Sequence, residues 1–296
     1  MKNRLYIIVL AIFLAGCSDD DRLLPVPTGI SNLTAEPIVG GAHLQWEVPA
    51  DSAYTYLEIR YLKNQKQVIE KASKYANEYQ IHGLIAAEEF DFEVQPVNET
   101  ASARTEGEVF RVGPVRPEPR SPEISYFDDD LTQVEVTADM IETFTQEPSE
   151  GPKENLVDGD PQTYWHSAWS TGVAPLPHWI EIYFNEPTAL GAISYWFRNS
   201  SDPSGRPTQW ALETSSDGEN YTRVWESNIR PSEPVDKAQA LSFDKNYTSS
   251  FFRVVILNNH SGGSATFTHL GEIAFFEMAS SIVDREKEAE EDYYNF

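Results

Sequence analysis

Short runs of alternating apolar and polar residues constrain the fold of this chain more than any other feature of its sequence. The runs are, in the first part of the chain, residues 42–46, 56–61 and 90–97, and in the second part residues 178–184, 192–197 and 251–257. Each run has the length of a β-strand and is bounded by turn residues, whereas no helical period persists outside residues 281–292. Because one half-buried sheet cannot cover its own apolar face, these runs predict an all-β chain built from packed sandwiches.

A proline-rich stretch divides the chain into two parts. Residues 113–122 contain four prolines, which donate no backbone hydrogen bonds and keep the segment extended. We therefore expect one domain at 24–114, a linker at 115–122 and a second domain at 123–279. Residues 280–296 are densely acidic, and because like charges repel one another we expect a disordered acidic tail without a function.

The first residues have the pattern of an export signal. Lys2 and Arg4 precede the apolar residues 5–14, a run too short to cross a bilayer, which needs roughly 20 residues. A basic start, a short apolar core and small residues at the end are typical of a secretory signal peptide. The sequence Leu14-Ala15-Gly16-Cys17 resembles the lipobox of bacterial lipoproteins, which implies cleavage before Cys17 and lipidation of this residue.

Acidic residues follow the cysteine directly. Removal of a signal peptide at 1–16 leaves residues 17–23 as an acidic tether, which includes Ser18-Asp19-Asp20-Asp21. From the residues alone this segment is a solvated tether. It also resembles the surface-export signal of Bacteroidetes lipoproteins, which implies an outer membrane lipoprotein exposed at the cell surface.

Cysteine content and charge exclude several kinds of partner. Cys17 is the only cysteine, so the chain can form no internal disulfide bond. The 22 basic and 47 acidic residues give a net charge of −25, and loss of Lys2 and Arg4 with the signal peptide makes it −27. This charge disfavours nucleic acids and anionic lipid surfaces, so we expect membrane contact through the lipid anchor only. Neutral sugars, cations or simple solubility all remain compatible with it.

The first domain resembles a known family over nearly its whole length. The matching features are Pro25, Trp46 on the second strand, the run 56–61, Gly83-Leu84 and the segment Phe90-x-Phe92-x-Val94. They resemble a fibronectin type III domain, which implies an Ig-like sandwich with Trp46 in its core. We find no candidate site in this domain and interpret it as a spacer.

The second domain carries four sequence blocks in a characteristic order. They are residues 155–167 (NLVDGDPQTYWHS), 177–182 (PHWIEI), 215–218 (SSDG) and 271–273 (GEI). Together they resemble the coagulation factor 5/8 type C, or discoidin, domain, and most of all the carbohydrate-binding modules of family 32. The resemblance implies an eight-stranded, galactose-binding-like jelly-roll sandwich with ligand-binding loops at one end.

One acidic turn in this domain suggests a calcium ion. Asp158-Gly159-Asp160 can place carboxylates in a tight turn, and calcium takes six to eight oxygen ligands. From the residues alone, the segment could equally be a turn with solvated side chains. The family resemblance implies a structural calcium, and the residues that we predict for it are Asn155, Asp158, Asp160, Thr163 and Glu272.

Polar and aromatic residues gather in the loops that the resemblance assigns to ligand binding. We predict that His166, Trp169, Arg198, Asn199, Asp202 and Phe267 bind a glycan. Aromatic rings cover the apolar C–H face of a sugar, while polar side chains bond its hydroxyls. The family resemblance implies a galactose-type or amino sugar. Sugar-binding relatives carry an asparagine a few residues after the arginine, where this chain has Asp202 or Pro203. Asn199 could substitute for that asparagine.

Motifs of catalysis are missing from the sequence. It contains no Gly-x-Ser-x-Gly, no His-Glu-x-x-His, no phosphate-binding glycine loop and no second cysteine for a zinc site. We therefore expect a non-catalytic, surface-displayed glycan-binding lipoprotein. Two alternatives remain open, a protein–protein adhesion or scaffold lipoprotein and an accessory subunit that targets a separate glycoside hydrolase. Other glycan-utilisation proteins are expected partners in the second alternative.

Overall fold

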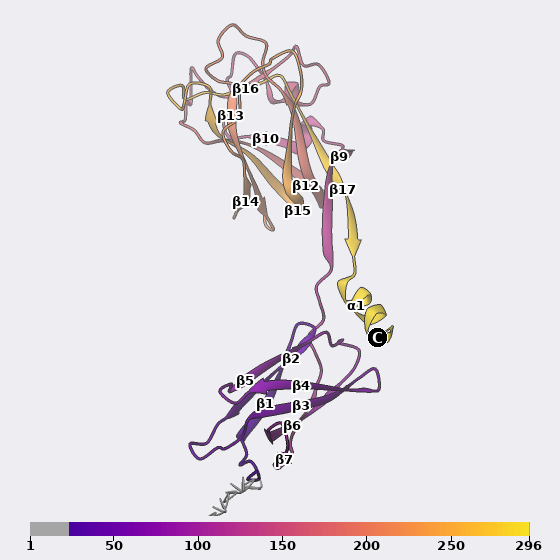
Figure 1. Ribbon diagram of the computed structural model, residues 1–296. Coiled ribbons are helices and arrows are strands. Elements are labelled where there is room, and N and C mark those ends of the chain that lie inside the picture. Colours follow the sequence, from indigo (N-terminus) through magenta and orange to yellow (C-terminus); the bar gives the residue numbers. More distant parts are fainter. Residues whose placement is uncertain (1–23, 296) are drawn as a thin grey trace, which may run out of the picture. The chain divides into compact units, whose positions relative to one another are not determined.

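The computed structural model describes residues 24–295, and within them the fold is all-β except for one α-helix and two short 3₁₀ turns (Figure 1). The predicted signal peptide 1–16, the lipidation site Cys17 and the tether 17–23 lie outside the described residues. The described residues form two compact units, residues 24–123 together with 284–295, and Ile124–Val283. None of the helices in the described part has the length and apolar character that crossing a membrane requires.

Two sheets form the sandwich of the first unit. One sheet has the order β1-β2-β5, with β1 at Ser31–Ile38, β2 at Gly41–Glu47 and β5 at Glu78–His82. The other has the order β4-β3-β6-β7 with β8 also paired to β6, where β3 is Tyr56–Lys63, β4 Lys66–Ser73, β6 Phe90–Glu99, β7 Arg104–Glu106 and β8 Phe110–Val115. The three runs predicted in this part are strands β2, β3 and β6.

The inward faces of these strands follow the period of two. Leu44 and Trp46 of β2 are buried, and so are Phe92 and Val94 of β6. The indole Nε1 of Trp46 donates to the carbonyl of Ala76 at 2.9 Å, which satisfies the one polar group of this ring. Trp46 is thus a core residue, as predicted.

The C-terminal residues correct one prediction. The acidic tail 280–296, expected to be disordered, instead continues strand β17 as far as Val283 and then forms helix α1 at Arg285–Tyr294. The side chain of Asp284 caps this helix by accepting from the backbone N–H groups of Glu286 and Lys287. Acidic residues in the first turn are favourable because the helix N-terminus carries partial positive charge.

Glu286 of α1 is held by groups of the first unit. Its carboxylate accepts from the backbone N–H of Ala86 at 2.7 Å, from the backbone N–H of Arg120 at 3.0 Å, and from the Arg120 guanidinium at 2.9 Å. The density of acidic residues predicted repulsion within the tail. It could not predict these partners, because they lie more than a hundred residues earlier in the chain.

Tyr293 anchors the other end of the helix. Its side chain is 2 % exposed, and its ring packs edge-on against Phe90 with the ring centroids 6.3 Å apart. Its hydroxyl accepts from the backbone N–H of Asn64 at 2.7 Å and donates to Glu88 at 2.8 Å. The helix is therefore an integral part of the first unit, although it follows the second unit in sequence.

Seven strands make up the main sheet of the second unit, in the order β14-β13-β15-β12-β17-β9 with β10 paired to β12. Their bounds are β9 Glu123–Val134, β10 Ile141–Thr143, β12 His178–Trp196, β13 Pro207–Ser215, β14 Thr222–Glu226, β15 Gln239–Asn259 and β17 Glu272–Val283. A separate pair joins β11 (Trp165–His166) to β16 (His269–Leu270), and 3₁₀ turns lie at Ala138–Met140 and Lys153–Leu156.

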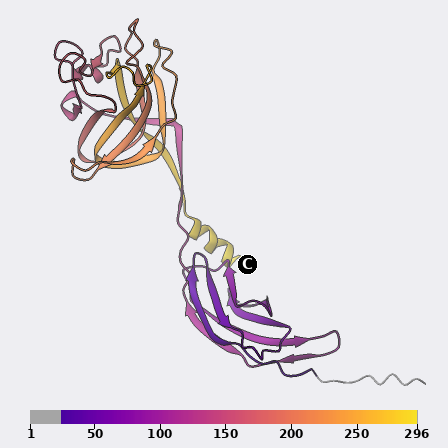
Figure 2. The same cartoon turned by 90° about the vertical axis from the view of Figure 1, so that its left-hand side faces the viewer.

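Strands β12 and β15 bend together and close the sandwich. Their register shifts between Tyr183 and Thr188 and again between Leu190 and Ala192. The first half of β12 also pairs with β10 and its second half with β17. Figure 2 shows the same sandwich turned by 90°. The runs at 178–184 and 192–197, which looked like two strands in the sequence, are the halves of β12. Side chains from both layers form one core, which includes Trp165, Ile182, Tyr195, Trp210, Phe252 and Phe275.

We predict that Tyr293→Ala lowers the free energy of unfolding of the first unit by about 3–5 kcal/mol, because a large buried ring is removed. Tyr293→Phe should cost about 1 kcal/mol, since only the hydroxyl contacts are lost. Tyr294→Ala is the matched control, because this neighbouring ring is 53 % exposed. Hydrogen exchange of the amides in β2, β3 and β6 measures the effect. Wild-type protection in Tyr293→Ala would show that the helix does not stabilise the unit.

Candidate functional site

Loops at one end of the second unit surround a hollow of about 200 Å³, here called the loop pocket. Its lining residues are Glu150, His166, Trp169, Arg198, Ser200, Asp202, Phe267 and His269. The structure thus brings together five of the six residues predicted to bind a glycan. Asn199 is the sixth, and it is exposed and does not line the pocket. Glu150, Ser200 and His269 line the pocket although the sequence analysis did not select them.

The short pair of strands β11 and β16 creates this pocket. It sets Trp165 opposite Leu270 and His166 opposite His269, and so joins segments that are about a hundred residues apart. Trp165 is fully buried and fixes β11 to the core. His166 and His269 then follow at the end of the core, where they face the loops.

Glu150 connects three side chains of the pocket. It accepts from the hydroxyl of Tyr164 at 2.6 Å and from the indole Nε1 of Trp169 at 2.9 Å. The guanidinium of Arg198 lies 3.7 Å from the carboxylate and 3.6 Å above the Tyr164 ring. The hydrogen bond from Tyr164 is the main cause that lowers the pKa of Glu150, so this carboxyl is ionised at neutral pH. Arg198 and Trp169 are therefore held in place before any ligand arrives.

A second carboxylate fixes the loop that carries Trp169. Glu147 is 2 % exposed and accepts from the backbone N–H groups of Trp169 and Ser170 and from the Ser170 hydroxyl. These bonds lower the pKa of Glu147 to about 2, and the bond from the Ser170 hydroxyl has the largest effect. The indole of Trp169 itself stays 49 % exposed. An aromatic face is thus presented to solvent on a backbone that cannot move freely.

Two buried histidines form the inner wall. Burial lowers the pKa of His166, and it lowers the pKa of His269 to about 3, so both rings are neutral at physiological pH. Nδ1 of His166 donates to the carbonyl of Ser167 at 2.7 Å, which leaves Nε2 as an acceptor. Nδ1 of His269 is buried without a hydrogen-bond partner in the described residues. The Phe267 ring lies 5.2 Å from the His166 ring, measured between centroids.

Two glycines allow the chain to approach these rings. A Cβ at Gly205 would lie 2.7 Å from carbon atoms of Phe267 and His269. Gly151 has a φ of +62°, and a Cβ there would lie 2.6 Å from the backbone nitrogen of His166. Any larger residue at these positions would displace the wall of the pocket.

The chemistry of the pocket favours a polar, uncharged ligand with an apolar face. Arg198 supplies donors, while Glu150, Asp202 and the neutral imidazoles supply acceptors. The rings of Trp169 and Phe267 supply flat apolar surface. The two carboxylates disfavour an anion, because they outnumber the single arginine.

The residues predicted to bind calcium lie in one loop and at the start of β17. They are Asn155, Asp158, Asp160, Thr163 and Glu272. Asp158 accepts from the backbone N–H of Asp160 at 2.9 Å and from the hydroxyl of Thr163 at 2.8 Å. Asn155 donates to the carbonyl of Tyr164 at 2.9 Å and so ties the loop together. Within residues 24–295, no three His, Cys, Asp or Glu side chains are grouped so that they could hold a metal ion by themselves.

Glu272 nevertheless has the environment of an incomplete cation site. Its Oε2 is buried and has no hydrogen-bond partner in the described part of the chain. Burial raises the pKa of Glu272 to about 7, and the nearby carboxylates of Asp158 and Asp160 add to this rise. The backbone N–H of Gly159 opposes it. A positive charge at this position would offset both the cost of burying the ionised Glu272 carboxylate and its repulsion by the neighbouring carboxylates.

Main-chain oxygens surround Gly271, the residue before Glu272. A Cβ on this glycine would lie 2.9, 3.3 and 3.5 Å from the carbonyl oxygens of Pro161, Phe197 and Thr163. Carbonyl and carboxylate oxygens are the ligands that calcium prefers. These residues therefore fit a calcium ion if backbone oxygens and Thr163 supply the ligands that the carboxylates alone are too few to provide.

Comparison with known proteins agrees with the division of the chain. Residues 140–270 match the family model of the F5/8 type C domain. Residues 27–114 match the model of a domain of unknown function, DUF4959. The fibronectin type III resemblance of the first unit stays a prediction beside this match.

Several solved structures are similar to part of this chain. One is CpGH89CBM32-5 from Clostridium perfringens in complex with GalNAc-beta-1,3-galactose, with 22 % identity over 46 % of this chain and 92 % of that chain and a TM-score of 0.38. The family 32 module of NanJ from C. perfringens, in complex with galactose, has 17 % identity over 52 % of this chain and 100 % of that chain, with a TM-score of 0.38. The C-terminal domain of a chitobiase from Bacteroides fragilis has 23 % identity over 50 % of this chain and 98 % of that chain, with a TM-score of 0.37.

The order of the sequence blocks, the jelly-roll sandwich and the match over residues 140–270 agree with one another. The chain therefore contains an F5/8 type C domain, preceded by a DUF4959 domain.

Proposed function

We propose that this protein is a non-catalytic glycan-binding protein whose F5/8 type C domain binds a neutral galactose-type or amino sugar in the loop pocket. The observation that carries this proposal is the convergence of Arg198, Trp169, Phe267 and two neutral histidines on one hollow. These side chains come from three separate segments of the chain, and each supplies one kind of contact that a sugar requires.

The arrangement suggests how a sugar would be bound. Trp169 and Phe267 can cover an apolar C–H face, while Arg198 donates to ring hydroxyls. Nε2 of His166 and the carboxylate of Glu150 can receive hydroxyl protons. Because the pocket is small and open, we expect a Kd on the order of 0.1–1 mM, or about 4–5.5 kcal/mol. Dense display on a cell surface would compensate for this weak affinity through avidity.

We predict that Arg198→Ala abolishes detectable sugar binding, because the loss of charge-assisted bonds costs about 1.5–3 kcal/mol from a weak starting affinity. Trp169→Ala should weaken binding through loss of the stacking face, and both variants should melt close to wild type. Arg116→Ala is the control, since this guanidinium lies in the first unit and is exposed. The measurement is titration calorimetry with galactose and N-acetylgalactosamine.

Two results would contradict the sugar proposal. One is unchanged affinity in Arg198→Ala. The other is a folded wild-type protein that binds nothing on a broad glycan array in the presence of calcium. The second result would favour the adhesion or scaffold alternative, with a protein partner on the same loops.

We further propose that Glu272 and the loop of Asp158 and Asp160 hold a structural calcium ion. The support is the unpartnered buried oxygen of Glu272, the carboxylates of Asp158 and Asp160 near it, and the carbonyls of Pro161 and Thr163 around the preceding Gly271. Bound calcium would supply the positive charge that these oxygens lack. It would thereby fix the loop that precedes Trp165 and His166.

We predict that calcium raises the melting temperature of the F5/8 domain and that a chelator reverses this. Binding to the folded state alone stabilises by roughly 2.7 kcal/mol at a hundredfold excess over Kd. Glu272→Gln should remove the calcium effect without destabilising the calcium-free domain, because the amide carries no buried charge. Glu277→Gln, on the exposed face of β17, is the matched control. Scanning calorimetry decides the matter, and a melt insensitive to chelator in the wild type excludes the site.

We also propose that lipid on Cys17 anchors the protein at the outer surface of the cell, with the first unit as a spacer. This rests on the residues before and after Cys17, which the structure does not describe. Cys17→Ala should abolish partition into detergent, because it removes the residue that would carry the lipid. Several acyl chains are needed for a stable anchor. An antibody should reach the wild-type protein on intact cells. Shielding until the outer membrane is broken would instead place the protein on the periplasmic side. An accessory role beside a separate glycoside hydrolase remains compatible with this location.

A further inference from the structure

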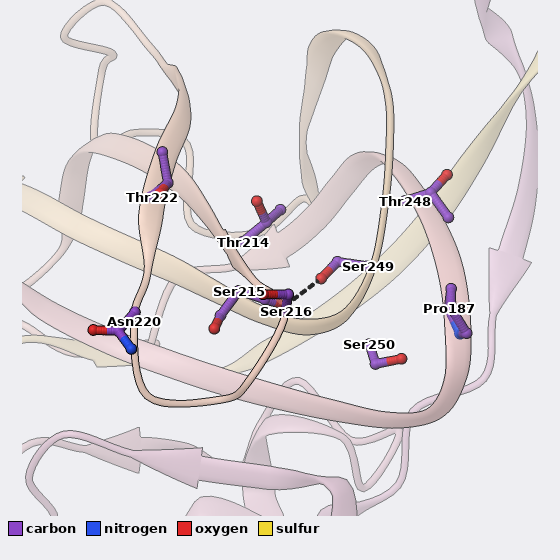
Figure 3. Close-up of a pocket in the computed structure, with 9 residues that line it drawn as sticks. All are labelled: Pro187, Thr214, Ser215, Ser216, Asn220, Thr222, Thr248, Ser249 and Ser250. Atoms are coloured by element: carbon purple, nitrogen blue, oxygen red, sulfur yellow. Dashed lines mark hydrogen bonds between the residues drawn. The ribbon is translucent and has the colours of Figure 1, made fainter.

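A second hollow of the F5/8 domain, larger than the loop pocket, has no part in the proposed function. It has a volume of about 450 Å³ and is here called the hydroxyl hollow. Its lining residues are Pro187, Thr214, Ser215, Ser216, Asn220, Thr222, Thr248, Ser249 and Ser250. Figure 3 shows that they come from the hairpin of β13 and β14 on one side and from the bends of β12 and β15 on the other.

The hydroxyl hollow is remote from the loop pocket. Strand β13 begins at Pro207, which pairs with Asn259 near the loops, and ends at Ser215 in the hollow. Its nine residues span about 25–30 Å at roughly 3.3 Å per residue. A ligand bound in one site therefore cannot touch the other, unless it is a long chain.

The lining of the hydroxyl hollow is polar but carries no charge, although the chain as a whole has a net charge of −25. Five of its hydroxyls make no hydrogen bond to any described residue. They belong to Thr214, Ser216, Thr222, Thr248 and Ser250. Each can both donate and accept, so the wall offers a set of uncommitted partners.

The rim is held rigidly. The hydroxyl of Ser249 donates to the carbonyl of Ser215 at 2.8 Å, the bond drawn in Figure 3. At the hairpin turn, Asp217 accepts from the hydroxyl of Ser215 and from the side-chain amide of Asn220, both at 2.8 Å. These bonds order the turn before a ligand binds, which reduces the entropic cost of binding.

Aromatic rings lie at the same rim. The ring of Phe251, which follows Ser250 in β15, packs so closely on the turn that a Cβ on Gly218 would lie 2.8 Å from it. Tyr183 stands opposite Phe251 across the β12–β15 pair, with ring centroids 5.1 Å apart, and its side chain is 47 % exposed. The hollow therefore has free hydroxyls inside, and an aromatic pair, Phe251 and the half-exposed Tyr183, packs on the turn that forms its rim.

This combination selects one class of ligand. An anion would find no lysine or arginine among the lining residues, and a cation would find no carboxylate. A purely apolar ligand would leave the hydroxyls unpaired, which is unfavourable. A sugar offers hydroxyls that donate and accept together with a C–H face for the exposed ring.

We propose that the hydroxyl hollow is a second carbohydrate-binding site, which takes a neutral sugar unit between the β13–β14 turn and the β12–β15 bend. The F5/8 domain then has two independent sites, one at each end of β13. Two weak sites on one rigid domain can engage two points of a glycan chain, or two chains, and so raise the avidity for a polymer without a new contact.

The test is a titration of the isotope-labelled mature chain, residues 17–296 with Cys17→Ser, followed by nuclear magnetic resonance. The probes are galactose, glucose and N-acetylglucosamine, each added separately. The side-chain amide of Asn220 and the backbone amides of Ser216 and Ser250 report on the hydroxyl hollow. The indole N–H of Trp169 reports on the loop pocket, so the two sites are judged by different signals.

We expect the hollow signals to shift saturably with at least one probe, and to do so equally in Arg198→Ala. The double variant Thr214→Val and Thr222→Val, which keeps the side-chain volumes, should weaken this response about fivefold or more, and Tyr183→Ala should weaken it as well. Ser102→Ala, an exposed serine of the first unit, is the control and should change nothing.

The inference is overturned if the hollow signals stay still, or drift without saturation, while the Trp169 signal responds to sugar. It is also overturned if the threonine and tyrosine variants respond as the wild type does. A silent Trp169 signal with a saturable hollow response would instead refute the proposed function of the loop pocket and leave the second site standing.

Discussion

The antiparallel pairing of β12 with β15 is the constraint on which the rest of the F5/8 domain depends. Both strands are long enough to run through two layers, and their shared register shifts turn them together. Where they bend, Pro187 and Ser249 come to face the hairpin of β13 and β14. Where they end, at Trp196 and Asn259, the loops of the first pocket begin. One pairing thus positions both candidate sites.

Acidic residues in this chain act mainly through the groups that surround them. Glu147 and Glu150 are ionised because hydroxyl and N–H donors point at them, and so they hold Trp169 and Arg198 in place. Glu286 binds the C-terminal helix to the first unit through Ala86 and Arg120. Glu272 is the contrasting case, because it is buried beside other carboxylates and its Oε2 has no hydrogen-bond partner among the described residues. The same side chain therefore serves as a structural bond in one place and as a candidate metal ligand in another.

The sequence allowed most of the loop pocket to be predicted, since ring and guanidinium side chains in polar loops are conspicuous. Glu150 was missed because a single carboxylate in an acidic chain carries no signal of its own. Its partners Tyr164 and Trp169 follow only fourteen and nineteen residues later, but the path of a loop cannot be predicted from sequence, so these contacts could not be foreseen. Asn199 was selected by analogy with relatives, but it is exposed and does not line the pocket. The hydroxyl hollow could not be predicted from the sequence, because serines and threonines at strand ends are common.

By itself, the sequence determined the positions of six strand segments, the inward faces of β2 and β6 and the burial of Trp46, because a period of two is a local property of the chain. Only the tertiary structure decided that two predicted strands are one bent strand and that the acidic tail is a helix docked through Tyr293. It alone joined β11 to β16 and so placed His166 beside His269. The physical reason is the same in each case: pairing and burial between distant segments depend on which partner is nearest in space, and periodicity along the chain does not record it.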